Sequence, residues 1–131
     1  MSHNDPYFSS DLNNVARAIA HWRAGKGFNT HWKNAPEKLM LVVTELGEAM
    51  EAYRHLSERT LSHMQGNVEL GTPANIDPDQ APILENFIEE LADTFIRLLD
   101  MTGSFEIDIS TAIARKMAKN EKRPYKHGKE C

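Results

Sequence analysis

The sequence contains a single cysteine among its 131 residues, and it is the last residue, Cys131. A disulfide within one chain needs two cysteines, so the fold does without one, as is typical of proteins from a reducing compartment. No apolar run approaches the roughly 18 residues that a membrane-spanning helix needs. The N-terminal residues lack the basic and then apolar layout of a secretory signal. We therefore expect a cytoplasmic protein without a membrane partner.

An excess of positive charge is also missing. The chain has 15 Lys and Arg residues against 19 Asp and Glu residues, which gives a net charge of −4. General nucleic-acid binders are usually basic, so we expect no nucleic-acid partner. The hydrophobic share of 40% is that of an ordinary globular protein, and the length suits one domain. The composition therefore predicts a single soluble domain over residues 1–131.

The spacing of the apolar residues predicts an all-α fold, because no alternating run is long enough for a confident strand. Pro36 suits the first turn of a helix, and Ser104 is a predicted cap for the last one. The glycines and prolines of residues 58–82 predict a long loop. Flexible ends are expected at about residues 1–8 and 125–131. The four predicted helices cover about residues 10–24, 36 to 55 or 57, 83–101 and 104–122.

Two of the predicted helices carry the same pattern of acids. Residues 45–48 read Glu-Leu-Gly-Glu and residues 90–93 read Glu-Leu-Ala-Asp. Side chains three positions apart point to the same side of a helix. Four carboxylates facing one another would repel strongly unless a cation lay between them, and Mg²⁺ or Mn²⁺ suits oxygen ligands best. The predicted metal ligands are Glu45, Glu48, Glu90 and Asp93.

The competing interpretation treats the acids as the solvent-facing part of an amphipathic pattern, which is the ordinary explanation for a single pair. The matched geometry of two pairs favours the metal site. A di-iron bundle would need a histidine three residues after a glutamate, whereas Glu48 and Asp93 stand there. Arg97 lies one turn after Asp93, so we expect an ion pair between them, with a phosphate contact as the alternative.

A group of polar residues near the C-terminus has helical spacing. Lys116, Asn120 and Arg123 stand at i, i+4 and i+7, so they share one face of the last predicted helix. Cations at this end also interact favourably with the helix dipole, which is the simpler explanation. Beside a metal site they suit the oxygens of a polyphosphate. Phe28 and Trp32 are candidates for stacking on a base, or they close the end of the bundle.

Taken together, the motifs show a likeness to a known family. The two acidic motifs, followed by Lys-Met-x-x-Asn-x-x-Arg-Pro at residues 116–124, resemble the all-α nucleoside triphosphate pyrophosphohydrolases of the MazG-like superfamily. The likeness covers about residues 32–127 apart from the middle loop. It implies a four-helix bundle, usually completed as a homodimer or homotetramer. It also implies Mg²⁺-dependent hydrolysis of a (deoxy)nucleoside triphosphate to the monophosphate and pyrophosphate, a house-cleaning reaction of the nucleotide pool.

The resemblance also implies roles for residues. It gives metal binding to the four acids and phosphate binding to Lys116, Asn120 and Arg123. We expect in-line attack of activated water on the α-phosphorus, with Glu48 as the candidate catalytic residue that orients this water. Many relatives have two adjacent acids at the start of the first motif, but here the earlier position is Thr44. The number of metals and the general base are therefore open.

Two alternatives to this activity remain open. One is a non-catalytic nucleotide-binding or metal-binding helical module, or a dimerisation protein that kept the scaffold, for which Thr44 is the best support. The other is a phosphoribosyl-ATP pyrophosphohydrolase, which has a related helical architecture. The sequence does not select a base or a sugar.

Overall fold

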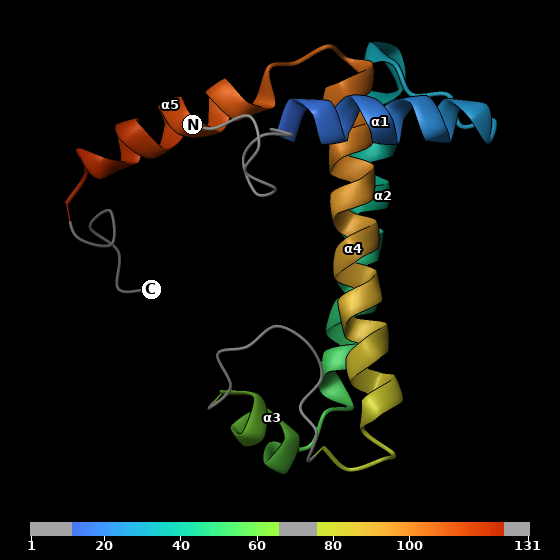
Figure 1. Cartoon of the computed structure of the whole chain (residues 1–131), viewed down its shortest axis with the longest axis vertical. Coiled ribbons are helices and arrows are strands. Elements are labelled where there is room, and N and C mark those ends of the chain that lie inside the picture. Colours follow the sequence, from blue (N-terminus) through green and yellow to red (C-terminus); the bar gives the residue numbers. More distant parts are fainter. Residues whose placement is uncertain (1–11, 66–75, 125–131) are drawn as a thin grey trace. The chain divides into compact units, whose positions relative to one another are not determined.

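The computed structural model describes residues 12–65 and 76–124. Every regular element in these two ranges is helical (Figure 1), which confirms the all-α prediction. None of these helices is long and apolar enough to cross a lipid bilayer. The predicted flexible ends lie outside the described residues. The elements are α1 (Leu12–Gly25), a short 3₁₀ helix η1 (Trp32–Asn34), α2 (Ala35–Arg54), α3 (Glu58–Gln65), α4 (Ala81–Ser104) and α5 (Ile109–Glu121).

Contacts divide the chain into two compact units. The central unit is Lys33–Leu98, and the terminal unit combines Met1–Trp32 with Leu99–Cys131. The helix α4 contributes residues to both. The single domain stays a prediction.

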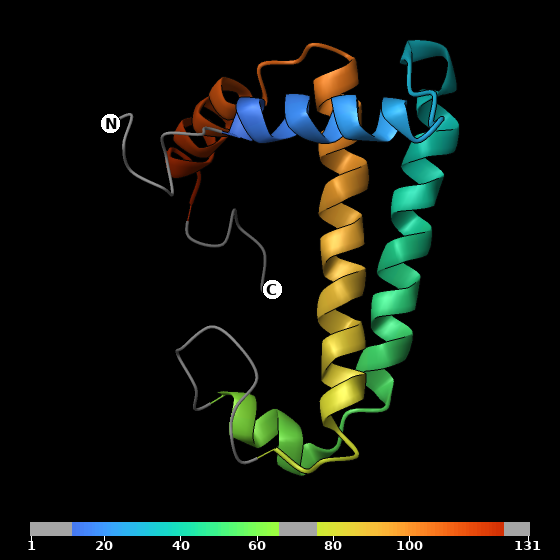
Figure 2. The same ribbon diagram turned by 45° about the vertical axis from the view of Figure 1, so that its right-hand side comes forward.

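The core of the central unit lies between α2 and α4, which run side by side in opposite directions (Figures 1 and 2). Pro36 occupies the first turn of α2, as predicted, because its missing N–H has no partner there anyway. The buried face of α2 consists of Val42, Ala49 and Ala52, and α4 buries Leu84. Small alanine side chains let two helices approach closely, so this core is narrow and depends on close packing.

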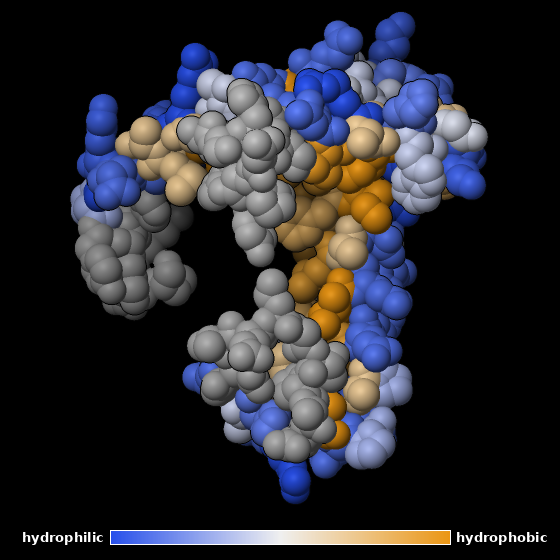
Figure 3. All heavy atoms as spheres, in the orientation of Figure 1, coloured by the Kyte–Doolittle hydropathy of each residue, from blue (hydrophilic) through white to orange (hydrophobic). Residues whose placement is uncertain are grey.

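A second apolar face of α2 stays exposed. Its five large side chains are each between 43% and 55% exposed. They follow one another at spacings of four, three, four and three residues, which is the heptad pattern of helices that pack on other helices. On α4, three further large side chains are at least 37% exposed. Figure 3 shows hydrophobic residues along the length of these helices. We call this set the open apolar face: Leu39, Val43, Leu46, Met50, Tyr53, Ile88, Phe95 and Leu98.

The predicted loop over residues 58–82 is wrong in its first part, where α3 forms. Ser57 caps this helix, because its Oγ accepts a hydrogen bond from the Thr60 backbone N–H at 3.1 Å. The side-chain oxygen of Gln80 accepts from the Ser57 N–H at 2.7 Å and from Thr60 Oγ1 at 2.9 Å. Thr60 and Gln80 are both buried. Buried polar contacts therefore stabilise α3, whereas the other helices were predicted from their apolar periodicity. Residues 66–75 lie outside the described part of the chain.

In the terminal unit, α1 crosses the last turns of α4. A Cβ atom built on Gly103 would overlap the carbonyl oxygen of Ala16 on α1, so glycine is required for this close approach. The predicted end of the third helix at about residue 101 is therefore wrong. Gly103 lies inside α4 and makes room for α1 there.

The start of α5 also differs from the prediction. Asp108, and not Ser104, caps this helix, accepting from the Thr111 backbone N–H at 3.0 Å. Ser104 belongs to α4, and its hydroxyl donates to Asp100. A hydrogen bond from the Asn13 side chain, together with the Thr111 N–H, lowers the pKa of Asp108 to about 2. The charged carboxylate thus joins the start of α5 to α1.

Candidate metal centre

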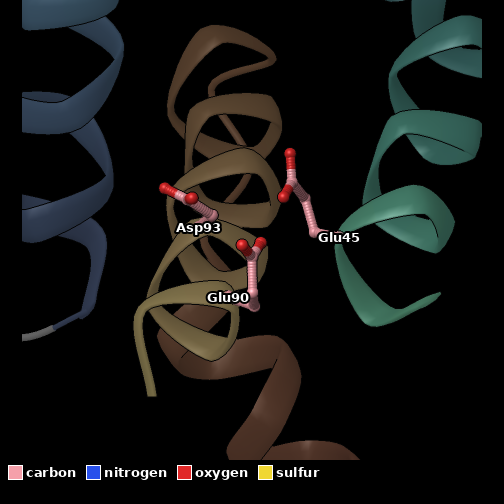
Figure 4. Close-up of side chains that lie close together, drawn as sticks. All are labelled: Glu45, Glu90 and Asp93. Carbon is pink, nitrogen blue, oxygen red and sulfur yellow. The ribbon is translucent and has the colours of Figure 1, made fainter. Parts of the chain in front are cut away.

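Three of the four predicted metal ligands come together between the two long helices of the central unit. Glu45 extends from α2, and Glu90 and Asp93 extend from α4 (Figure 4). Each side chain offers one carboxylate oxygen, and these three oxygens lie within 4.8 Å of one another. The three-residue spacing places Glu90 and Asp93 on one side of α4, as the sequence pattern predicts.

The fourth acid, Glu48, lies at the edge of the same cluster. Its side chain is exposed, yet it is within hydrogen-bonding reach of both Glu45 and Glu90. It therefore adds a fourth negative charge that is accessible from solvent.

Glu90 shows how unfavourable the cluster is without a cation. Burial, followed by hydrogen bonding and charge repulsion from Glu48 and Glu45, raises the pKa of Glu90 to about 7. Its Oε2 atom is buried and has no hydrogen-bond donor among the residues that the structure describes. The close neighbours of Glu90 that raise its pKa are themselves acids, so this oxygen requires either a shared proton or a positive ion.

The guanidinium of Arg97 contacts the cluster, but its partner differs from the one that the sequence pattern predicts. Arg97 Nε donates to Glu45 Oε1 at 2.6 Å, and the two side chains are 25% and 10% exposed. The expected ion pair between Asp93 and Arg97 is thus replaced by a contact between helices. Burial by itself would raise the pKa of Glu45, but hydrogen bonds, led by that from Arg97, lower it. Arg97 stands seven residues after Glu90 and hence on the same face of α4, a signal that could have predicted this contact.

The donor set fits a hard divalent cation. All of its side chains are carboxylates, which are the ligands that Mg²⁺ and Mn²⁺ prefer, and the unpartnered Glu90 Oε2 provides an acceptor that needs a positive charge. Thr44 adds nothing to this set. Its hydroxyl donates to the Met40 carbonyl oxygen at 3.1 Å within α2.

The predicted phosphate-binding residues belong to the terminal unit. Lys116 and Asn120 lie on α5, but the helix ends at Glu121, so Arg123 follows the helix instead of continuing its face. The Arg123 N–H donates to the Asn120 carbonyl oxygen at 3.0 Å in the closing turn. Asn120 Oδ1 is buried without a partner in the described ranges. The role of these three side chains in phosphate binding stays a prediction.

The predicted base-stacking residues also lie in the terminal unit, and each contacts another side chain. The ring of Trp32 stacks on Phe105 with 4.3 Å between centroids. The guanidinium of Arg23 lies 4.2 Å from the centre of the Phe28 ring. Both predicted residues remain about half exposed or more. Each ring therefore keeps exposed surface, and base stacking stays a prediction.

Comparisons with known proteins found no matching family model, no matching curated protein and no matching solved structure. The resemblance to the MazG-like superfamily therefore stays a prediction from the motifs.

Proposed function

We propose that this protein hydrolyses a (deoxy)nucleoside triphosphate to the monophosphate and pyrophosphate with Mg²⁺, for which Mn²⁺ can substitute, in house-cleaning of the nucleotide pool. The observation that carries the proposal is the convergence of three carboxylates from α2 and α4, with Glu48 at their edge, in a cluster where a buried Glu90 oxygen has no donor among the described residues. Such a site holds divalent cations, and enzymes use divalent cations with carboxylate ligands to bind and cleave polyphosphates.

Each part of the proposed reaction is assigned to particular residues. Glu45, Glu90 and Asp93 would hold the ion, which when bound neutralises charge on phosphate oxygens and activates water. Glu48 is exposed at the rim and would accept a hydrogen bond from the attacking water, which orients it toward the α-phosphorus. Lys116, Asn120 and Arg123 would bind the phosphates, and Phe28 and Trp32 would stack on the base.

The test is a panel of ribonucleoside and deoxynucleoside triphosphates, with phosphoribosyl-ATP included, in which pyrophosphate release is measured with Mg²⁺ and with chelator. We expect release from at least one nucleotide, and loss of release by 100-fold or more in Glu48→Gln and Asp93→Asn. Glu89→Gln is the matched control, because Glu89 is exposed and adjacent to Glu90. Undiminished turnover in both site variants, with helical content preserved, would reject the assignment. Hydrolysis of phosphoribosyl-ATP alone would assign the related activity in its place.

A non-catalytic module is the second candidate, and the position of Thr44 favours it. This position holds a threonine, whose hydroxyl is bonded to the helix backbone, so the cluster lacks the additional acid that many members of the MazG-like superfamily have there. Calorimetry separates the two candidates. Binding of a nucleotide with Mg²⁺ but without product supports the module, whereas product formation supports the enzyme.

We also propose that a second copy of the chain covers the open apolar face, completing a four-helix bundle. Half-exposed side chains of this size each present on the order of 100 Å². Eight of them therefore present about 800 Å², the area that each partner buries in an interface of standard size. Heptad spacing on two antiparallel helices suits an identical helix pair related by two-fold symmetry.

A further inference from the structure

Within the proposed metal centre, one ligand is already engaged by a side chain of opposite charge. Arg97 bonds to Glu45 at 2.6 Å, and Glu45 is one of the three acids whose oxygens lie within 4.8 Å of one another. We propose that Arg97 competes with the divalent cation for Glu45, and that cation binding releases the Arg97 guanidinium to bind an anion. This inference rests on the proposed function, because it assumes that the carboxylate cluster binds a metal.

The burial of Glu45 makes the competition direct. Its side chain is 10% exposed and lies in the narrow α2–α4 interface, so the carboxylate has little room to turn between two separate cations. The contact with Arg97 is short and charge-assisted, and it lowers the pKa of Glu45. A divalent ion that takes Glu45 Oε1 as its ligand therefore replaces this bond.

The released guanidinium needs a new hydrogen-bond partner. Its N–H groups lose the Glu45 carboxylate and are left without that acceptor in a partly buried site, which costs free energy. An anion that bridges the ion and the guanidinium supplies the missing acceptor. Guanidinium binds phosphate oxygens through paired N–H groups, so a polyphosphate matches both cations at once.

This arrangement predicts an order of binding. Without metal, Arg97 neutralises part of the acid cluster and is occupied by Glu45. With metal, the ion offsets two negative charges of the cluster, and Arg97 adds a positive group at the rim, where its side chain is 25% exposed. Polyphosphate binding should therefore depend on metal for two reasons: the metal itself contacts the anion, and it also frees Arg97.

The first test is isothermal titration of the protein with Mn²⁺ alone, without nucleotide. We expect Arg97→Gln to bind Mn²⁺ at least ten times more tightly than wild type, because the competing cation is gone. The matched control is Arg54→Gln, since Arg54 pairs with Glu51 on the exposed surface of α2. The control should bind Mn²⁺ like wild type. Equal affinity of wild type and Arg97→Gln, or weaker binding by the variant, would overturn the competition.

The second test measures binding of tripolyphosphate at saturating Mn²⁺. We expect Arg97→Gln to bind it at least ten times more weakly than wild type, and Arg97→Lys to recover part of the loss because it keeps the charge. Unchanged tripolyphosphate affinity in Arg97→Gln would overturn the release of the guanidinium toward an anion. Circular dichroism of each variant checks that the helices are intact, and Arg97→Lys provides a charge-preserving variant should Arg97→Gln fail to fold.

These outcomes separate this inference from the proposed function. Tighter Mn²⁺ binding by Arg97→Gln in a protein that hydrolyses no nucleotide supports the competition and rejects the enzyme. Hydrolysis with equal Mn²⁺ affinity in both proteins rejects the competition and supports the enzyme. Absence of Mn²⁺ binding in wild type and variant alike overturns both.

Discussion

Arg23 and Asp100 form an ion pair of 2.9 Å between Nε and Oδ2, and both side chains are buried. Asp100 also accepts hydrogen bonds from Thr30 Oγ1 at 2.6 Å and from Ser104 Oγ at 3.2 Å. The Arg23 guanidinium lies over the Phe28 ring. The pair therefore fastens α1, and the segment that follows it, to the end of α4 within the terminal unit.

We predict that Asp100→Asn lowers the free energy of unfolding by about 3–5 kcal/mol, because the substitution leaves the buried Arg23 charge without its carboxylate. Urea unfolding at pH 7, followed by circular dichroism, measures the change. Glu51→Gln is the matched control, since its ion pair with Arg54 is exposed and should contribute less than about 1 kcal/mol. A loss of stability no larger than that of the control would show that the buried pair is dispensable.

A second prediction concerns the pH dependence of the metal-free protein. The pKa of Glu90 is raised from 4.5 to about 7, so the folded state binds this proton more tightly than the unfolded state does. Stability from this group is fully present below about pH 4.5 and is lost as the pH rises through about 7. With chelator present, Glu90→Gln should therefore raise the thermal midpoint at pH 8 by a few degrees and reduce its fall between pH 5 and pH 8.

Scanning calorimetry at the two pH values checks this prediction. Glu89→Gln, an exposed neighbour, should show the pH dependence of wild type. If Glu90→Gln were less stable than wild type at pH 8, the ionised Glu90 would be satisfied in the metal-free protein. In that case the need of the cluster for a cation would be much weaker.

The long helices could be predicted from the sequence because their signals are local. Apolar spacing, Pro36 at a helix start and Pro124 after a helix end depend on a few neighbouring residues. The helix α3 was missed because its stability comes from buried polar contacts between Thr60 and Gln80, 20 residues apart in sequence. The third predicted helix ended too early, at about residue 101, because Gly103 is needed for the close approach of the α1 backbone, which no local pattern reveals.

Part of the candidate site could also be predicted from local sequence patterns. The three-residue spacing of the acids indicated which side chains share a face, and the structure brings them together between α2 and α4. The partner of Arg97 was predicted wrongly because only the i,i+4 neighbour on its own helix was considered, whereas Glu45 lies 52 positions away in sequence and is reached from the face of α4 that carries Glu90. Apolar spacing alone also does not show which side of α2 faces α4. Val42, Ala49 and Ala52 are buried against α4, whereas the larger residues of the open apolar face remain exposed.

The open apolar face gives a prediction about mass in solution. We expect the wild-type protein to elute with about twice the 14.9 kDa of one chain in size-exclusion chromatography with light scattering. Val43→Glu should shift the protein to the mass of one chain, because it places an unpaired charge in the middle of the interface. Met40→Glu is the matched control. Met40 is similarly exposed, at 62% against 55% for Val43, but lies outside the heptad positions. A wild-type protein that elutes only as a monomer would count against a second copy on this face.

The last prediction compares two glycines inside helices. Gly47 has no atom within 4 Å of an added Cβ, so Gly47→Ala should raise the free energy of unfolding by about 0.5–1 kcal/mol through the lower entropy of the unfolded chain. Gly103→Ala should lower it by about 1–3 kcal/mol, because its Cβ would meet the backbone of Ala16, which cannot move aside as a flexible side chain would. Urea unfolding of both variants under the same conditions measures the two changes. Equal effects of the same sign would show that helix propensity alone decides the change in stability, and that α1 does not approach Gly103 closely enough to exclude a Cβ atom.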